Sequence, residues 1–367
     1  MKLVIVGAGP SGIGLGILLK KLNFHDFIIL EKEDIGASFL KWPKEMKLIT
    51  PSFTGHGFGM LDLNALAPET SPAYTFGKEH LTGVEYAKYL QLLVSHYKLP
   101  VRKAYVKKVE KGDEIFQIYT EEQVIESTYL VWATGEYATP DLSPFEGSEL
   151  CLHNSYVRSW VDLQGEEFTV IGGYESGIDA AYHLTQNNKN VTVISKSSPW
   201  KSPKADPSIS LSPFTKERLE IADDTDRLEI LEDVEVLKVS IMDGDYVLYL
   251  SDGTTHVSKT RPILATGFIP GVKQIQELFE WDNSKIVKLT LKDESTITPG
   301  LFLVGPNVKH QNVIFCYIYK FRQRFAVIAK EILNRSNITY PNEVFDIYRE
   351  NNMYLDDLSC CEVNCEC

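Results

Sequence analysis

The sequence predicts an α/β protein made of two dinucleotide-binding, Rossmann-like domains, with the second domain inserted into the first. Two observations predict this organisation. A β-branched strand runs into a glycine-rich turn and a helix twice, at residues 2–14 and 168–179. Each half then ends in a strand that runs into the tripeptide ATG, at residues 129–135 and 262–267. Apolar strands that alternate with helical segments indicate a parallel sheet covered on both faces.

Length, composition and charge limit the interpretation further. With 367 residues the chain is long enough for two domains with their own cores, and its 44% apolar and 24% charged residues are typical of a globular protein. The formal charge of −13 argues against nucleic acid or an anionic membrane as the main partner, because both would repel it. No apolar run approaches the roughly 20 residues that span a bilayer. The chain begins directly in a strand without a cleavable leader, so we expect a cytoplasmic protein without a membrane span.

The first glycine-rich turn fits the pattern G-x-G-x-x-G directly after a strand. In this pattern the first glycine permits the tight turn, the second lets a pyrophosphate approach, and the third lets helix and strand pack closely. The helix N-terminus supplies N–H donors and positive partial charge. Glu31 follows the last glycine at the spacing expected of a carboxylate that binds a ribose diol. We therefore predict a nucleotide site formed by Gly7, Gly9, Pro10, Ser11, Gly12, Glu31 and Lys32.

The second turn keeps the first and third glycines but has Tyr174 where the second is expected. Gly173 provides backbone freedom beside it. The backbone N–H groups that bind phosphate stay available whatever the side chain is, and the ring can point out of the turn and act as a gate. We therefore expect a second nucleotide site with altered phosphate geometry at Gly172, Gly173, Tyr174, Glu175, Ser176 and Gly177. The alternative is a domain that keeps the fold and has lost the ligand.

The strands that follow the two turns end in opposite charges. Lys196 lies at the same offset from the second turn as Glu31 does from the first. A carboxylate accepts from a free 2′-hydroxyl and repels a 2′-phosphate, whereas a cation flanked by hydroxyls does the reverse. The first turn therefore suits FAD or NAD, and the second suits NADPH, with Ser195 and Lys196 as candidate ligands of the 2′-phosphate. The alternative is that Lys196 is a solvent-facing residue at a strand end.

The order of G-x-G-x-x-G, Glu, ATG, a second glycine-rich turn and a second ATG resembles the flavin-containing monooxygenases, and among them the bacterial CzcO-type, cation-efflux-associated oxidoreductases. The resemblance extends to about residue 335. It implies an FAD-binding domain of residues 1–147 and 298–340, an inserted NAD(P)H-binding domain of residues 148–297, and a C-terminal tail of residues 341–367. The implied cofactors are FAD and NADPH.

The resemblance also implies individual cofactor contacts. Residues 36–43 resemble the segment that runs beside the flavin, and the strand around Val106 resembles one whose backbone faces the adenine. The two ATG motifs and the turn at Gly305 resemble further contacts with the nucleotides. The implied contacts are Ser38, Trp42, Val106, Ala133, Thr134, Gly135, Thr266, Gly267, Gly305 and Pro306.

Three departures from the family pattern weaken the oxygenase interpretation and leave the FAD interpretation intact. Many relatives have Gly-Asp where this chain has Gly305-Pro306, so a carboxylate that would bind the FAD chain is missing. The family's Leu-x-Thr-Asn run ends here in Pro51, which offers no donor. The family's F-x-G-x-x-x-H fingerprint has two extra residues before His153.

The resemblance implies an FAD-dependent oxidoreductase reduced by NADPH, a monooxygenase that oxygenates a small-molecule substrate through a C4a-peroxyflavin. The flavin supplies the chemistry, so no catalytic residue is named. Residues 1–359 contain no Cys-x-x-Cys pair, because Cys151 and Cys316 stand alone, and we expect no dithiol relay there.

The tail carries Cys360, Cys361, Cys365 and Cys367. Thiolates at this spacing suit contact with a soft metal or a mobile redox relay, and an inert solvated tail is the plain alternative. Two further functions therefore stay open. One is an NADPH-dependent reductase of a disulfide, quinone or metal ion with the tail thiols as relay, and the other is a redox- or metal-sensing flavoprotein. A homodimer is also open.

Overall fold

A computed structural model describes residues 1–53, 61–204 and 206–358. By contacts between residues the chain divides into two compact units. Unit 1 consists of Met1–Leu40, Pro51–Ala138 and Pro270–Cys367, and unit 2 consists of Lys41–Thr50 and Thr139–Ile269. In the described part of the chain, no helix has the length and apolar character required to cross a membrane.

Unit 1 is built on a five-stranded parallel sheet in the order β16-β7-β1-β2-β3. The strands are β1 (Leu3–Val6), β2 (Phe27–Glu31), β3 (Val101–Lys103), β7 (Tyr129–Trp132) and β16 (Leu301–Leu303). Every residue of β1, β7 and β16 is buried, because both faces of the sheet are covered. This explains why these strands read as unbroken apolar runs.

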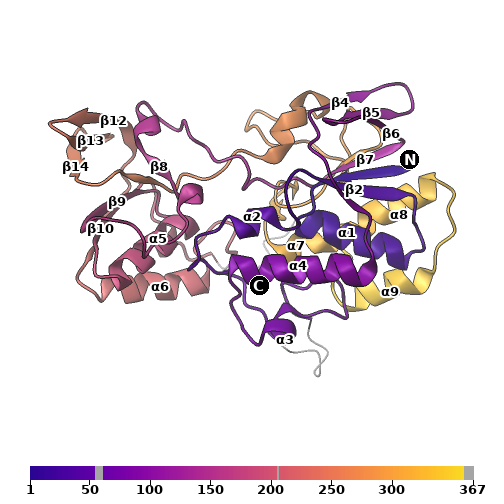
Figure 1. The fold of residues 1–367 in the computed structure, drawn as a ribbon, viewed down its shortest axis with the longest axis horizontal. Helices are drawn as coiled ribbons and strands as arrows, with labels where there is room; N and C mark the ends of the chain where they lie inside the picture. Colours follow the sequence, from indigo (N-terminus) through magenta and orange to yellow (C-terminus); the bar gives the residue numbers. More distant parts are fainter. Residues whose placement is uncertain (54–60, 205, 359–367) are drawn as a thin grey trace. The chain divides into compact units, whose positions relative to one another are not determined.

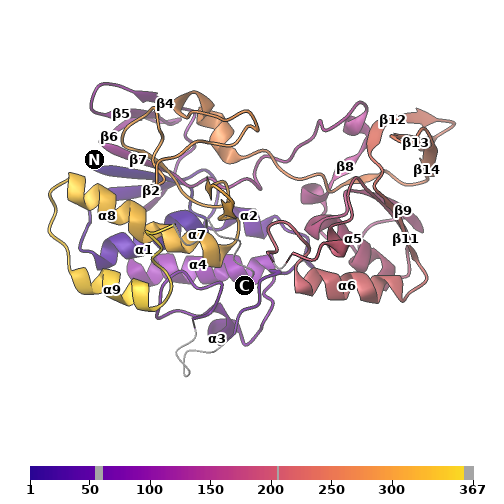
Figure 2. The same cartoon turned by 180° about the vertical axis from the view of Figure 1, so that it is seen from behind.

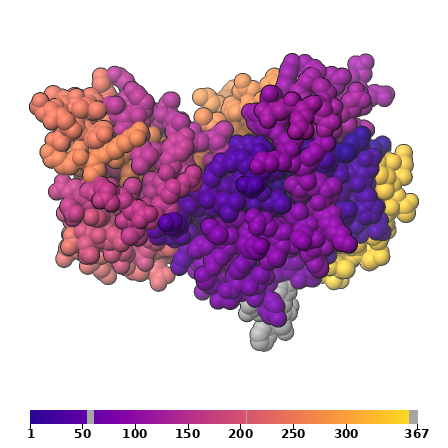
Figure 3. Space-filling model, viewed as in Figure 1, coloured from indigo at the N-terminus to yellow at the C-terminus, as the bar shows by residue number. Residues whose placement is uncertain are grey.

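Helices cover one face of this sheet and an antiparallel sheet covers the other (Figures 1 and 2). The helices include α1 (Pro10–Lys21), α4 (Gly83–Tyr97) and α8 (Phe325–Arg335), and the small sheet has β4 (Lys108–Lys111), β5 (Phe116–Tyr119) and β6 (Val124–Ser127). Gly14 of α1 lies directly against the ring of Phe325 in α8. The space-filling view accordingly shows the yellow C-terminal helices beside the indigo N-terminal segment (Figure 3). Shorter elements are α2 (Ala37–Leu40), α3 (Pro72–Phe76), η5 (Gly271–Leu278), β17 (Lys309–His310), β18 (Val313–Ile314), α7 (Ile318–Phe321), η6 (Arg322–Arg324) and α9 (Asn342–Glu350).

Unit 2 repeats the same plan. Its parallel sheet has the order β11-β10-β9-β15-β8, with β8 (Leu152–His153), β9 (Glu167–Ile171), β10 (Asn190–Ser195), β11 (Leu228–Glu232) and β15 (Ile263–Leu264). Helices α5 (Glu175–Gln186) and α6 (Pro213–Asp223) pack together on one side, and the antiparallel strands β12 (Val236–Met242), β13 (Asp245–Leu250) and β14 (Thr255–Ser258) lie on the other (Figure 1). Buried side chains between α5 and the sheet, such as Val170, Leu184 and Val193, form its core. The short helices are η2 (Ser148–Leu150), η3 (Asn154–Tyr156) and η4 (Pro199–Lys201).

The α/β fold with two Rossmann-like units is confirmed. Residues 270–297, which the sequence interpretation places in the second domain, belong to unit 1, and residues 41–50, placed in the first, belong to unit 2. Residues 318–335 form the consecutive helices α7, η6 and α8. The nucleotide that each unit binds stays a prediction.

Candidate functional site

The first glycine-rich turn joins β1 to α1 at the carboxyl end of the sheet, where open α/β folds bind ligands. Gly7 has φ +112°, and a Cβ atom there would lie 2.5 Å from the carbonyl oxygen of Ala133. A side chain at Gly12 would collide with the carbonyl oxygen of Gly7. Gly9, the N-cap of α1, differs, because a Cβ atom there would meet no heavy atom within 4 Å. The fold therefore requires glycine at positions 7 and 12, whereas position 9 is open for a ligand to approach.

The turn at Gly305 packs on this first turn. Gly305 has φ +113°, and a Cβ atom there would lie 2.8 Å from Oγ of Ser11, which is buried in the first turn of α1. Pro10 occupies the first position of the same helix, where its missing N–H is not needed. The structure thus brings Ser11 and the Gly305-Pro306 turn together, as the sequence interpretation requires.

The carboxylate of Glu31 is oriented by the turn itself. Its Oε2 accepts a hydrogen bond from the N–H of Ala8 at 2.8 Å, and its Oε1 accepts from the N–H of Glu33 at 2.9 Å. Each oxygen has a further lone pair that a ribose hydroxyl can use. The exposed ammonium group of Lys32 lies 3.7 Å from the carboxylate of Glu33. The open approach at Gly9 and the fixed carboxylate of Glu31 fit the pyrophosphate and ribose of FAD.

The two ATG motifs hold corresponding hydroxyl groups. In the described part of the chain, Oγ1 of Thr134 and Oγ1 of Thr266 are both buried without a hydrogen-bond partner. Gly271 packs against Thr134, and its N–H donates to the carbonyl of Gly135 at 2.8 Å. In unit 2, the carbonyl of Gly267 lies 3.0 Å from Nε2 of His153. Burial lowers the pKa of His153, and this hydrogen bond raises it in part.

Three other predicted cofactor contacts, Ser38, Trp42 and Val106, lie outside the two glycine-rich turns. Ser38 lies in α2 of unit 1 and is half-buried, whereas Trp42 belongs to unit 2. Val106 is 3% exposed, and its carbonyl accepts from Nε2 of Gln274 at 2.5 Å. Ser38 and Trp42, expected together beside the flavin, therefore lie in different units.

One carboxylate near the first site was missed by the sequence reasoning. Oε2 of Glu136, the residue after the first ATG, accepts a hydrogen bond from Nδ2 of Asn307 at 3.2 Å. The two residues follow the neighbouring parallel strands β7 and β16. Burial raises the pKa of Glu136, and the hydrogen bond from Asn307 lowers it in part. The signal in the sequence is an acid directly after ATG, near the turn whose Pro306 lacks the acidic side chain of related flavoproteins.

The second turn has the same backbone as the first. Gly172 has φ +112°, and a side chain at Gly177 would collide with the carbonyl oxygen of Gly172. Tyr174 is the N-cap of α5, with φ −98° and ψ −165°. A residue of any type adopts this extended conformation without strain. The tyrosine therefore leaves the backbone of the turn intact.

The side chains of Tyr174 and Glu175 are directed at a neighbouring segment. The hydroxyl of Tyr174 donates to the carbonyl oxygens of Pro207 and Ser210, each at 2.9 Å. The carboxylate of Glu175 accepts from the N–H of Ser212 at 2.6 Å, from its hydroxyl at 3.1 Å, and from the hydroxyl of Thr215. Burial raises the pKa of Glu175, and these hydrogen bonds lower it in part. The two side chains thus fix the segment that leads into α6.

The end of β10 has the predicted hydroxyl and cation. Ser195 is 3% exposed, and its hydroxyl donates to the carbonyl of Ser197 at 2.6 Å. A Cβ atom at Gly173 would lie 2.5 Å from Oγ of Ser195 and 2.9 Å from the ring of Trp200, so glycine is required there. Lys196 is exposed, and no acidic side chain in the described residues pairs with it. Its charge is available to an anionic ligand.

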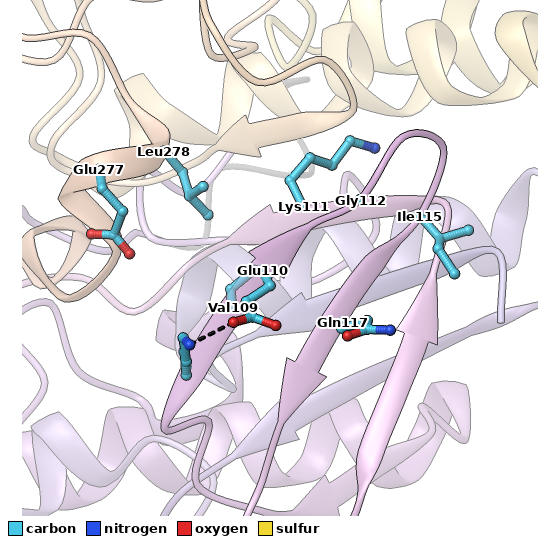
Figure 4. A pocket seen from close by; sticks show the side chains of 9 residues that line it. Val109, Glu110, Lys111, Gly112, Ile115, Gln117, Glu277 and Leu278 are labelled. Atoms are coloured by element: carbon cyan, nitrogen blue, oxygen red, sulfur yellow. Dashed lines mark hydrogen bonds and ion pairs between the residues drawn. The ribbon is translucent and has the colours of Figure 1, made fainter.

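A pocket of about 530 Å³ in unit 1 does not coincide with these turns (Figure 4). It lies between the β4–β5 hairpin and the end of η5, and Lys108 pairs with Glu110 at 2.5 Å on its edge. Its lining residues are Lys108, Val109, Glu110, Lys111, Gly112, Ile115, Gln117, Glu277 and Leu278. None of these is a predicted cofactor contact, so the pocket is not assigned to either nucleotide.

The described cysteines offer no redox pair. Cys151 is 5% exposed, and burial raises the pKa of its thiol to about 12, which disfavours a reactive thiolate. Cys316 is half-buried and forms no disulfide. The four tail cysteines, Cys360, Cys361, Cys365 and Cys367, lie outside the described residues. Within those residues, no group of three or more His, Cys, Asp or Glu side chains could hold a metal ion.

Comparison with known proteins gives a family match over most of the chain. The profile of the pyridine nucleotide-disulphide oxidoreductases matches residues 4–305. This match contains both glycine-rich turns, both ATG motifs and the Gly305 turn.

Curated relatives fall into two groups. The probable indole-3-pyruvate monooxygenase YUCCA10 of Arabidopsis thaliana is 28% identical over 204 residues, which cover 52% of this chain and 51% of that protein. The uncharacterized oxidoreductase CzcO of Bacillus subtilis is 27% identical, with 50% and 51% covered. The chain thus spans about half the length of these relatives. The bacilliredoxin reductase Bdr of Bacillus subtilis is 23% identical over 92% of this chain and 98% of its own length.

Solved structures share the fold. The bacillithiol disulfide reductase Bdr (YpdA) from Staphylococcus aureus aligns with a TM-score of 0.75 at 20% identity, over 91% of this chain and 98% of that one. A flavin-containing monooxygenase from Stenotrophomonas maltophilia aligns with a TM-score of 0.72 at 17% identity and the same coverage. At these identities the likeness shows the fold alone.

Proposed function

Because the chain belongs to the pyridine nucleotide-disulphide oxidoreductase family, we propose that it takes a hydride from NADPH onto FAD and passes the electrons to a small diffusible acceptor. The chain is a flavoprotein oxidoreductase, and FAD and NADPH are its cofactors. When bound, FAD supplies the redox chemistry, and the protein supplies binding, orientation and access.

One observation carries the assignment of the two nucleotides. Two turns with matching backbones are each followed by a strand, and opposite charges stand at the ends of these strands. Glu31 is held by the N–H groups of Ala8 and Glu33, whereas Lys196 is exposed and pairs with no acidic side chain of the described residues. A fixed carboxylate accepts from a free ribose diol, and an exposed cation attracts a 2′-phosphate. This contrast supports FAD on unit 1 and NADPH on unit 2.

The first candidate acceptor is dioxygen, with transfer of one oxygen atom to a small-molecule substrate and release of the other as water. Similarity to a probable monooxygenase and to a CzcO oxidoreductase over about half the length of each supports this monooxygenase function.

The second candidate acceptor is a low-molecular-weight disulfide. Its support is the alignment with a bacilliredoxin reductase over 98% of that protein's length, whereas the chain covers only about half of the monooxygenase and CzcO relatives. This reaction would consume one NADPH and release two thiols for each disulfide. Deletion of residues 359–367 would show whether the tail thiols take part.

Rapid mixing of the reduced enzyme with oxygen separates the two candidates. A monooxygenase that is given its substrate uses the electrons from NADPH to oxygenate that substrate and to form water. It therefore releases less than one hydrogen peroxide for each NADPH oxidised. Full release of hydrogen peroxide under all substrate conditions, together with NADPH-dependent thiol formation from small disulfides, would instead establish the reductase.

The nucleotide assignment has its own test in Lys196→Glu. Loss of a charge-assisted contact with the 2′-phosphate should raise KM for NADPH by roughly tenfold or more, and leave KM for NADH nearly unchanged. The matched control is Lys216→Glu on α6, a charge reversal at a residue outside the predicted sites. Equal changes in KM for NADPH and for NADH would show that Lys196 does not contact the 2′-phosphate.

A further inference from the structure

The open space beside Gly9 shows where a ligand reaches a turn of this kind. A Cβ atom at Gly9 would meet nothing within 4 Å, so the Cβ direction of this residue leads away from the protein. A pyrophosphate approaches such a turn at its second glycine. Any side chain at the corresponding position of the second turn therefore starts out on the side from which a phosphate arrives.

Tyr174 occupies that position with the same backbone conformation. The residue is 38% exposed, and its hydroxyl lies 2.9 Å from each of the carbonyl oxygens of Pro207 and Ser210, to which it donates. We call residues 206–212 the latch segment. Because the ring leaves the turn in the Cβ direction and ends on this segment, ring and segment lie together on the approach side of the turn.

The latch segment is a compact turn with its own hydrogen bonds. Oδ1 of Asp206 accepts from the N–H of Ser208 at 2.9 Å, and its carbonyl accepts from the N–H groups of Ile209 and Ser210 at 3.1 and 3.2 Å. Ser210 and Leu211 are each 1% exposed, so the C-terminal end of the segment is packed into unit 2. The exposed Ile209 and the residues before it are the part that can open.

The segment has one attachment that opening does not need to break. Ser212 caps α6, and both its N–H and its hydroxyl donate to Glu175, the first residue of α5. The hydroxyl of Tyr174, by contrast, binds the segment at Pro207 and Ser210. We therefore take Glu175 and Ser212 as the pivot and the hydroxyl of Tyr174 as one contact that opening has to break.

Donors for a phosphate remain beneath the ring. Among the described residues, no acceptor forms a hydrogen bond with the backbone N–H of Ser176 in the first turn of α5. Helix N-termini with such groups bind phosphate. The turn therefore keeps its capacity to bind an anion when the approach is clear.

From these contacts we propose that Tyr174 determines the affinity of the second turn for NADPH by latching residues 206–212 over its phosphate-binding side. The inference rests on the proposed function, in which unit 2 binds NADPH. Nucleotide binds the open state, so its apparent dissociation constant is the intrinsic value divided by the open fraction. Loss of the tyrosine hydroxyl removes the one proton that the carbonyl oxygens of Pro207 and Ser210 share, and should increase the ratio of open to closed forms by roughly 5- to 30-fold.

The experiment uses the full-length, FAD-loaded protein with oxidised NADP⁺, so that binding is measured without reduction of the flavin. Calorimetry gives the dissociation constant for the wild type, Tyr174→Phe, Tyr174→Gly and the control Tyr156→Phe. Tyr156 lies in unit 2, is 54% exposed, and its hydroxyl forms no hydrogen bond with the described part of the chain. Hydrogen exchange of peptides that cover residues 206–216 reports opening of the latch segment independently of binding.

Tyr174→Phe should lower the dissociation constant for NADP⁺ by roughly 5- to 30-fold and speed hydrogen exchange in the latch segment. Tyr174→Gly should bind NADP⁺ at least as tightly as Tyr174→Phe. The control Tyr156→Phe should match the wild type in both measurements. Unchanged or weaker binding by Tyr174→Phe would overturn the inference, as would a failure of all four proteins to bind. If the variants bind NADP⁺ as predicted but NADPH does not reduce the flavin, the latch stands and the proposed function fails.

Discussion

Gly9 and Tyr174 have nearly the same backbone conformation at the N-caps of α1 and α5, with φ −85° and ψ −172° at Gly9 and φ −98° and ψ −165° at Tyr174. They stand at corresponding positions of two turns in one chain and differ in the side chain. Gly9 leaves the approach to its turn open, and Tyr174 places an aromatic ring there. The effect of a side chain at this position can therefore be tested in both units.

Two alanine substitutions separate the folding role of the first turn from its binding role. Gly9→Ala should leave the thermal stability of the apoprotein within about 1 °C, because its Cβ meets nothing, and should weaken FAD binding by tenfold or more, on the order of 1.4 kcal/mol. Gly12→Ala should destabilise the apoprotein by about 1–3 kcal/mol, because its Cβ collides with the carbonyl oxygen of Gly7. Flavin titration and apoprotein melting measure the two effects. Equal destabilisation by both substitutions would contradict the distinction.

The carboxylate of Glu31 should contribute to FAD binding through both its charge and its position. Glu31→Gln keeps one oxygen acceptor for the N–H of Ala8 or Glu33 and should weaken FAD binding less than Glu31→Ala, which removes both. We expect losses of about 3–10-fold and about 10–100-fold, since a hydrogen bond to a charged group is worth about 1.5–3 kcal/mol. Fluorescence quenching of added FAD measures the affinity. An alanine variant that binds FAD as tightly as the wild type would exclude this role.

Local backbone requirements explain which parts of the sites could be predicted from the sequence. Gly7, Gly12, Gly172 and Gly177 are required by positive φ or by close contact with a carbonyl, and such needs appear as a spacing along the chain. The charge contrast of Glu31 and Lys196 follows from the same spacing.

Some contacts in the candidate sites could not be predicted from the sequence, because they join residues that are distant along the chain. The hydrogen bond of Asn307 to Glu136 joins residues far apart in the chain, and so do the bonds from Tyr174 to Pro207 and Ser210. A linear pattern does not encode the direction of these side chains. The placement of residues 270–297 in unit 1 has the same origin, since η5 packs on β4 and Gly271 packs on Thr134 without any shift in composition.

Removal of one partner from a buried ion-pair network should destabilise unit 1 strongly. Asp293 is fully buried and accepts from Nε and Nη2 of Arg324 at 2.8 and 3.0 Å, and it pairs with Nε2 of His310 at 2.5 Å. Asp293→Asn leaves the guanidinium without its counter-charge and should reduce the free energy of unfolding by about 3–5 kcal/mol. The control is Asp346→Asn in an exposed pair with Arg349, which should cost less than about 1 kcal/mol. Urea unfolding of the apoprotein measures both, and similar costs would contradict the prediction.

The pKa of Glu136 predicts a pH dependence of stability. Burial raises its folded pKa above the ordinary 4.5, so the folded protein holds a proton that the unfolded chain releases. The stability from the neutral carboxyl group is present below the unfolded pKa and is lost as pH rises through the folded pKa. Glu136→Gln has no carboxyl group to ionise and does not suffer this loss. The melting temperature of the variant, relative to that of the wild type, should therefore rise as pH increases from about 4 to about 8. A constant difference across that range would show that Glu136 does not titrate as described.

We expect NADPH to reduce the FAD that is bound to this chain. The most direct test is anaerobic titration of the purified FAD-loaded protein, with NADPH and NADH compared in parallel. We predict complete loss of the oxidised-flavin absorbance with one equivalent of NADPH, and much slower reduction by NADH. A protein that takes up no FAD, or that holds FAD unreduced under excess NADPH, would contradict it.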